Sequence, residues 1–199
     1  MLGLYYNTPS DWASRALAQP ENLLLDHLFC EKKAAAMALH TLRVFGQRFP
    51  VLKNLMTGLA QEEFEHAEQC QKLLSSFSRA PQPQTDGSRY AQGLRKHCNV
   101  RGRDNFIDML LVCSLIEARS AERFKLLADC ARGSTLGHFY EDLYASEVNH
   151  YTLFVGMSTD FFGEEITQKR LHELRVAAAD LIRSLPAGPY VHSGPGTGQ

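Results

Sequence analysis

Apolar residues recur at steps of three and four along most of this chain, a spacing that places side chains on one face of an α-helix. The pattern predicts a short leading helix that ends near Ala18, followed by five long helices. We expect the long helices over residues 20–48, 50–78, 104–130, 135–157 and 164–185. No segment alternates apolar and polar residues with a period of two, so the sequence predicts an all-α protein.

Proline and glycine mark where these helices begin and end. Pro20 and Pro50 stand at expected helix starts, because proline fits the first turn of a helix and interrupts its interior. Gly133 and Gly163 separate the last three helices. Residues 79–103 are rich in Pro, Gly, Gln and basic residues, and their periodicity is poor. We interpret them as a long crossover connection with a helical turn near residues 90–97, and connections of this length usually carry a function.

Chain length and composition indicate one ordinary globular domain. A chain of 199 residues is long enough for one buried core, which we expect over residues 1–185, with a Gly- and Pro-rich tail over 186–199. No apolar run approaches the roughly 20 residues that a membrane span needs, and the first residues lack the pattern of a secretory signal. Five cysteines without a C-x-x-C pair favour reduced thiols. We therefore expect a cytoplasmic protein without a membrane partner, as a monomer or a small homo-oligomer.

Glutamate interrupts the apolar stripe of four of the long helices. Two stripes carry one glutamate each, and two carry a Glu-x-x-His pair, which directs a carboxylate and an imidazole to the same side of the helix. An ionised carboxylate left unpaired in the protein interior costs several kcal/mol. The same stripes offer few basic residues that could neutralise these groups. The residues in question are Glu31, Glu63, His66, Glu117, Glu147 and His150.

Two divalent cations would balance the four carboxylates. One Glu from each of two helices and Glu-x-x-His from each of two others is the ligand arrangement of di-metal carboxylate proteins with a ferritin-like four-helix bundle. Carboxylate oxygen and imidazole nitrogen are better ligands for iron or manganese than for metals that prefer thiolates. The sequence therefore predicts a dinuclear metal site built by these six residues, and a plain helical bundle with buried ion pairs is the alternative.

Other residues near these stripes receive simpler interpretations. The isolated histidines are expected at the surface or as capping groups rather than as metal ligands; they are His27, His40, His138 and His172. Cys70 and Cys113 lie on the same helix faces as His66 and Glu117, and we expect them to fill space in the core. A position beside a metal cavity is the alternative for both thiols.

Basic residues gather in the crossover connection. The positions are Arg89, Arg95, Lys96, Arg101 and Arg103, and no acid occurs between Gly87 and Gly102. The net charge of the chain is −1, so an RNA partner would have to be attracted by a local patch. The cluster is interpreted either as an ordinary solvated loop or as a phosphate-contacting patch that docks RNA.

Several segments carry a more specific resemblance. LFCEKKAAAMALH, LAQEEFEHAEQC, LLVCSLIEARSAERF and LYASEVNHY, together with RKHCNVRGRDNF, resemble the tRNA 2-methylthio-N6-isopentenyladenosine hydroxylase family, MiaE. The resemblance covers nearly the whole chain. It implies a ferritin-like four-helix bundle with a long crossover between its second and third helices, a short N-terminal helix and a C-terminal fifth helix.

The same resemblance implies a function. Members of that family are di-iron monooxygenases that hydroxylate the isopentenyl side chain of a hypermodified adenosine in tRNA. We therefore expect two iron ions, dioxygen as co-substrate, and an external two-electron donor such as an electron-transfer reductase. The six Glu and His residues named above match the iron ligands of the family, with Glu63 and Glu147 as the bridging carboxylates. Two rival interpretations remain: another ferritin-like oxidase or ferroxidase that handles iron, and, more distantly, a non-enzymatic helical binding module.

Overall fold

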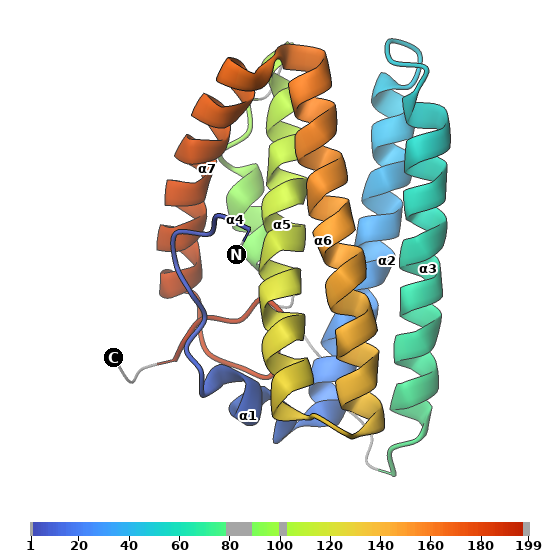
Figure 1. The fold of residues 1–199 in the computed structure, drawn as a ribbon, viewed down its shortest axis with the longest axis vertical. Coiled ribbons are helices and arrows are strands. Elements are labelled where there is room, and N and C mark those ends of the chain that lie inside the picture. The colour runs from blue at the N-terminus through green and yellow to red at the C-terminus, as the bar shows by residue number, and fades with distance from the viewer. Residues whose placement is uncertain (1, 79–88, 100–102, 197–199) are drawn as a thin grey trace. The chain divides into compact units, whose positions relative to one another are not determined.

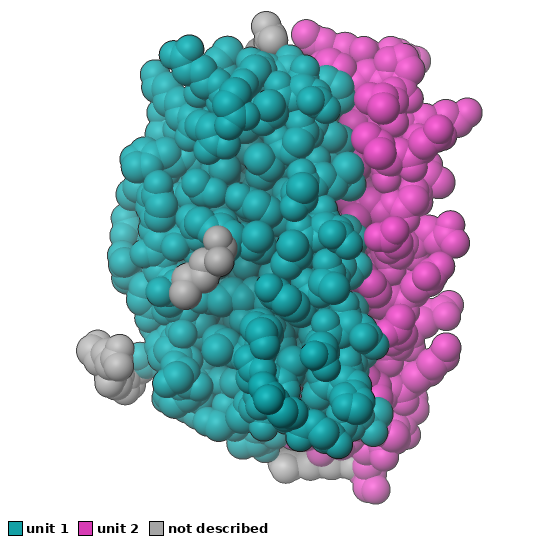
Figure 2. Space-filling view, in the orientation of Figure 1, with its two compact units in different colours: residues 1–18, 88–199 teal, residues 19–87 magenta. Residues whose placement is uncertain are grey.

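The structure is a computed structural model that describes residues 2–78, 89–99 and 103–196 (Figure 1). Within these ranges the chain forms seven helices and no strand, which confirms the all-α prediction. The chain divides into two compact units, coloured separately in Figure 2: residues 1–18 with 88–199, and residues 19–87. No helix among the described residues combines the length and the apolar character needed to cross a membrane.

The unit of residues 19–87 contains two long helices, α2 (Pro20–Phe45) and α3 (Leu52–Ser75), which pack along each other (Figure 1). The expected proline occupies the first turn of α2. This helix ends at Phe45, three residues earlier than expected, and the N–H of the following Gly46 donates to the carbonyl oxygen of Leu42 at 2.8 Å. The two helices bury the apolar stripes that the sequence indicated, including the positions that carry Glu31, Glu63 and His66.

The unit of residues 1–18 and 88–199 is built on a second pair of long helices. Its members are α5 (Arg103–Cys130) and α6 (Thr135–Phe162), which pack along each other. Three further helices lie against this pair: α1 (Trp12–Leu17) and α4 (Arg89–Arg95) contact α5, and α7 (Glu164–Ser184) contacts both long helices as well as α4. The helical turn expected near residues 90–97 is the short helix α4.

Two glycines set the ends of α6. Gly133 has a φ of +80° and Gly163 a φ of +89°, backbone conformations that residues with a Cβ rarely adopt. Between them, Ser134 caps the helix by accepting a hydrogen bond from the N–H of Gly137 at 3.0 Å. The helix runs to Phe162 rather than to the expected Met157, because Gly163, with its positive φ, ends the helix.

Two buried arginines on α5 bind the segments near the two ends of the described chain. Arg119 donates to the carbonyl oxygen of Tyr6 at 2.8 Å and pairs with Glu122. Glu122 in turn accepts hydrogen bonds from the N–H and the hydroxyl of Thr8, at 2.8 and 2.7 Å. The N-terminal segment is therefore fixed to α5 by a partly buried network of polar groups in which the buried charges have partners.

The second arginine binds the other end of the chain. Arg123 donates to the carbonyl oxygen of Val191 and, at 2.6 Å, to that of Ser193. The hydroxyl of Ser193 also accepts a hydrogen bond from the indole N–H of Trp12 at 3.1 Å. Both ends of the described chain are thus attached to α5, the helix that also carries Glu117. The predicted domain boundary at residue 185 stays a prediction.

Candidate metal centre

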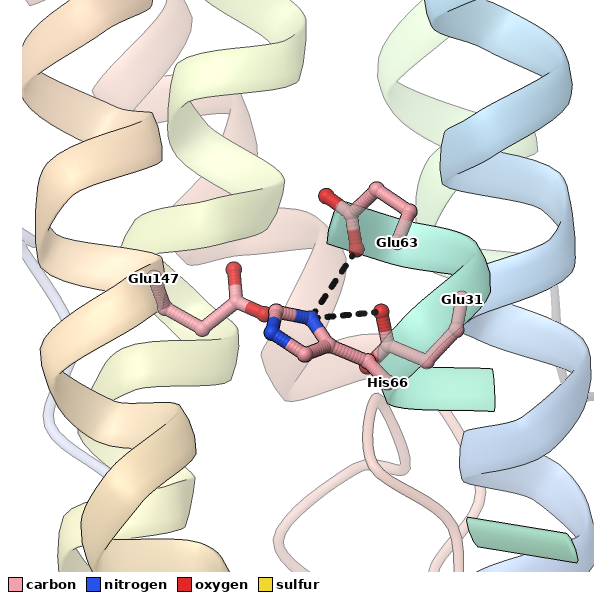
Figure 3. A group of neighbouring side chains, drawn as sticks. All are labelled: Glu31, Glu63, His66 and Glu147. Atoms are coloured by element: carbon pink, nitrogen blue, oxygen red, sulfur yellow. Dashed lines mark ion pairs between the residues drawn. The ribbon is translucent and has the colours of Figure 1, made fainter. Parts of the chain in front are cut away.

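Three predicted ligands come together in the unit of residues 19–87. Figure 3 shows the side chains of Glu31, Glu63 and His66 directed toward one another, the first from α2 and the other two from α3. All three are buried, and one ligand atom of each lies within 4.8 Å of the others. The Nδ1 atom of His66 lies 3.8 Å from Oε2 of Glu31 and 3.5 Å from Oε2 of Glu63. Two atoms that each lie about 2 Å from one metal ion are about 3–4 Å apart, so the spacing fits a shared ion.

The charges of this group favour a cation. Burial lowers the pKa of His66, but the carboxylates of Glu31 and Glu63 outweigh that effect and raise it to about 9. Burial raises the pKa of Glu31, yet the neighbouring histidines and a hydrogen bond with Glu63 bring it down to about 2. In the metal-free chain at neutral pH, the positive charge of protonated His66 therefore stabilises the same carboxylates that a bound metal ion would stabilise.

His27 lies against this group, and the expectation that it is a surface or capping residue is wrong. Its side chain is 0% exposed, and its Nε2 donates to Oε1 of Glu31. Burial by itself lowers the pKa of His27, but the Cys70 thiol and the Glu31 carboxylate raise it well above its ordinary value. The sequence held one signal of this contact, because His27 precedes Glu31 by one helical turn. The other isolated histidines, His40, His138 and His172, are exposed as expected.

The remaining predicted ligands lie in the other unit. Glu117 is buried on α5, and Glu147 and His150 are buried on α6, which packs along α5. The Nδ1 atom of His150 lies 3.8 Å from Oε2 of Glu147. This buried oxygen has no hydrogen-bond partner among the described residues, an arrangement that is costly unless a cation or water binds there. Figure 3 also draws Glu147, which α6 supplies.

The six residues fit a metal centre by the chemistry of their donor atoms. They supply four carboxylates and two imidazoles, all buried, and two of the carboxylates are followed by a histidine on the same helix face. Each unit offers both oxygen and nitrogen ligand atoms, from Glu31 and His66 in one unit and from Glu147 and His150 in the other. Such mixed ligands suit iron or manganese.

The basic cluster predicted to contact tRNA is described in part. Arg89 and Arg95 are exposed at the two ends of α4, and Lys96 is exposed directly after it. Arg101 lies outside the described residues. Arg103 begins α5, and its side chain lies outside the description as well.

A buried aspartate fixes the chain just after α4. Asp108 is 0% exposed and accepts hydrogen bonds from the backbone N–H and the side-chain amide of Asn99, both at 2.7 Å. Arg170 of α7 donates to the same carboxylate at 2.6 Å and to the carbonyl oxygen of His97 at 2.7 Å. Sequence reasoning missed this clamp, because its aspartate and its arginine are 62 positions apart. It holds residues 97–99 against α5 and α7.

The fold and the donor set define a class of protein. Buried Glu-x-x-His pairs on two helices and single buried glutamates on two others are typical of ferritin-like di-metal carboxylate proteins. The structure of "Protein 43 with aldehyde deformylating oxygenase activity" from Synechococcus is similar to this chain with a TM-score of 0.89 and 31% sequence identity, over 96% of both chains. The ferritin-like all-α fold class is thereby confirmed.

Sequence comparison identifies the family within that class. The sequence model of tRNA-(MS2IO6A)-hydroxylase (MiaE) matches residues 3–193. A tRNA 2-(methylsulfanyl)-N(6)-isopentenyladenosine(37) hydroxylase from Pseudomonas putida is 37% identical, over 94% of this chain and 90% of the relative. A hydroxylase of the same name from Salmonella typhimurium is 29% identical, over 96% of this chain and 87% of the relative. The chain belongs to the MiaE family of tRNA hydroxylases, which confirms the resemblance and makes it an enzyme.

Proposed function

We propose that this chain is a dioxygen-dependent di-iron monooxygenase that hydroxylates the isopentenyl side chain of 2-methylthio-N6-isopentenyladenosine in tRNA. Membership of the MiaE family over residues 3–193 supports the reaction and the substrate. The observation that carries the proposal is the buried group of Glu31, Glu63 and His66, because a hydroxylase of this class needs a metal centre in its interior and these residues fit one.

The six buried Glu and His residues, three from each unit, are proposed as the ligands of two iron ions. Two ferrous ions carry four positive charges, which offset the four carboxylates that would otherwise stand in the interior at a cost of several kcal/mol each. When bound, the iron centre supplies the activation of dioxygen for insertion into a C–H bond, with two electrons from an external donor such as a reductase. Manganese has the same ligand preferences, and metal analysis distinguishes the two ions.

The residues of the chain prepare the centre for this chemistry. His66 must release the proton that its raised pKa holds before its nitrogen binds iron. The neighbours of Glu63 and His66 along the buried face of α3 are Leu59, Ala67 and Cys70, all of them buried. An apolar surrounding of this kind keeps water away from a reactive centre and strengthens the electrostatic interactions of the ligands.

The exposed basic residues around α4 are proposed to contact tRNA. They provide a local concentration of positive charge, which the chain as a whole lacks, and would neutralise phosphates of the RNA. The residues are Arg89, Arg95 and Lys96, with Arg101 and Arg103. The hydrogen bonds of Asp108 to Asn99 and of Arg170 to His97 support this proposal, since they fix the chain directly after Lys96, and a fixed residue loses less entropy when it binds RNA. The cytoplasmic location and the small oligomeric state stay predictions.

Metal analysis with a matched pair of variants tests the proposal. Glu63 is 1% exposed, whereas its neighbour Glu62 is exposed, so Glu63→Gln removes a proposed ligand and Glu62→Gln makes the same chemical change at the surface. We expect about two iron ions per chain in the unaltered protein and in Glu62→Gln, and a clear loss in Glu63→Gln. A folded chain that takes up neither iron nor manganese would contradict the proposed metal centre.

The reaction itself is tested with tRNA that carries the isopentenyl modification. The reconstituted protein, supplied with a chemical reductant and isotopically labelled dioxygen, should add one labelled oxygen atom to the modified nucleoside, which mass spectrometry detects. The iron-deficient Glu63→Gln variant should not. Labelled tRNA product from the metal-free protein would contradict the role of iron.

The Synechococcus structure supplies a second candidate, oxygenase activity on aldehydes. Incubation with a long-chain aldehyde under the same conditions, followed by measurement of formate, separates the two activities. We expect tRNA to be the substrate, because the family match covers residues 3–193. Rapid iron oxidation without any organic product would instead favour the ferroxidase alternative. The non-enzymatic binding module is ruled out by membership of an enzyme family.

A further inference from the structure

Within residues 19–87, the two oxygens of Glu31 have different surroundings. Oε1 accepts a hydrogen bond from Nε2 of His27, which lies one helical turn earlier on α2 and is completely buried. Oε2 lies on the side of His66, 3.8 Å from its Nδ1. One oxygen is therefore held by an imidazole donor, and the other faces the residues proposed to bind metal.

His27 also has a neighbour on the adjacent helix. The Cys70 side chain of α3 is 0% exposed and lies close enough to His27 to raise its pKa. Cys70 lies one turn after His66 on the same helix. A buried thiol on the helix that carries Glu63 and His66 thus lies near the imidazole that binds Glu31.

We propose that His27 is a positioning residue that presents Oε2 of Glu31 to the metal, and that the neighbouring Cys70 thiol packs against the imidazole and keeps it in place. This role rests on the proposed metal site. A carboxylate can bind a metal through one oxygen or through both, and an N–H donor on one oxygen favours binding through the other. Hydrogen-bond partners of this kind orient ligands, and their loss typically lowers metal affinity on the order of 10–100-fold.

A purely structural role for His27 predicts a different result. If the imidazole only fills the interior and pairs with a buried carboxylate, its loss lowers the stability of the metal-free chain and leaves the bound metal unchanged. If it positions Glu31, the affinity for the metal and the geometry around the metal change as well. Measurements on the bound metal therefore separate the two roles.

Titration of the full chain with Co²⁺ provides these measurements, because the visible absorption of Co²⁺ reports its ligands without any turnover. The variants are His27→Leu, which removes the donor, and His27→Gln, which keeps an N–H donor. Cys70→Ala removes the thiol beside His27. His40→Gln, at an exposed position of the same helix, is the matched control.

We expect His27→Leu to bind Co²⁺ about 10–100-fold more weakly than the unaltered chain, with a changed spectrum. Cys70→Ala should change affinity and spectrum in the same direction but less, His27→Gln should recover part of both, and His40→Gln should change neither. Unaltered affinity and spectrum in His27→Leu, with only a lower melting temperature, would overturn the positioning role. If His27→Leu does not fold, the same comparison between His27→Gln, Cys70→Ala and the unaltered chain decides.

Failure of the proposed function gives a separate result. An unaltered chain that binds neither Co²⁺ nor iron overturns the metal site and the positioning role together. An unaltered chain that binds Co²⁺ but does not hydroxylate tRNA contradicts the proposed substrate, while the comparison of the variants still decides the role of His27.

Discussion

The affinity of the chain for a divalent metal should rise steeply with pH, because metal and proton compete for His66. The pKa of this histidine in the metal-free chain is raised to about 9 by Glu31 and Glu63. Because pH 7 lies about two units below this pKa, displacing the proton at pH 7 costs about 3 kcal/mol. This cost raises the dissociation constant of the metal roughly 100-fold. Between pH 6.5 and 8.5 we expect the affinity to increase about tenfold per pH unit from this proton alone.

Titration with Co²⁺ at several pH values, in the presence of a competing chelator of known affinity, measures this dependence. A pH indicator in weakly buffered solution should show the release of about one proton or more for each ion bound near pH 7. The exposed control His40→Gln should show the same slope. An affinity that is flat between pH 7 and 8.5, without proton release, would refute the competition at His66.

The metal-free chain should show the opposite pH dependence. A folded-state pKa above the unfolded value near 6.5 means that His66 contributes stability below about pH 6.5 and that this contribution is lost as the pH rises toward 9. The depressed pKa of Glu31, about 2, contributes stability above its unfolded value near 4.5, which is lost as the pH falls toward 2. Urea unfolding of the metal-free chain should therefore show the largest contribution of this pair between about pH 4.5 and 6.5.

Three further predictions address RNA binding and stability. Arg95→Gln with Lys96→Gln should weaken tRNA binding and reduce the slope of log affinity against log salt by about 2, whereas Lys53→Gln at the surface of α3 should change neither; an unchanged slope would remove the proposed phosphate contacts. Asp108→Asn should lower the free energy of unfolding by about 2 kcal/mol in urea titrations, because a buried carboxylate that accepts three hydrogen bonds loses its charge. Arg123→Met should lower it by about 3 kcal/mol, because two buried carbonyl oxygens lose their donor, and an unchanged midpoint would contradict this network.

Much of the fold follows from local pattern, and most of the differences lie at helix ends. Steps of three and four placed the long helices within a few residues, because amphipathic helices record their buried face in their sequence. The end of α6 was placed too early, at Met157, although Phe161 continues the stripe at a step of four and the helix runs to Phe162, directly before Gly163. Glycine with a positive φ was the better signal there.

The candidate site was predictable where it depended on helix faces. Glu31, Glu63 and His66 are buried as the periodicity required, because a residue on an apolar stripe faces the interior whatever its chemistry. The contact of His27 with Glu31 was harder to predict from the sequence. A histidine four positions before a glutamate lies close to it on any helix, but its burial and its contact with Cys70 depend on how α3 packs against α2.

The order of the segments along the chain has a consequence for how the protein is made. The helical hairpin of residues 19–87 interrupts a unit whose two parts are residues 1–18 and 88–199. The hairpin is complete as soon as its own residues have been synthesised, whereas Trp12 must wait for Ser193, 181 positions later, to accept its hydrogen bond. At about 5–20 residues per second, this delay lasts on the order of 10–40 s.

During that interval the indole of Trp12 and the apolar side of α1 lack the partners that bury them in the finished protein. Residues 191–193 thus complete the attachment of a segment that was synthesised long before them, and a nascent chain that stops before residue 191 lacks the carbonyl oxygens that receive the Arg123 guanidinium.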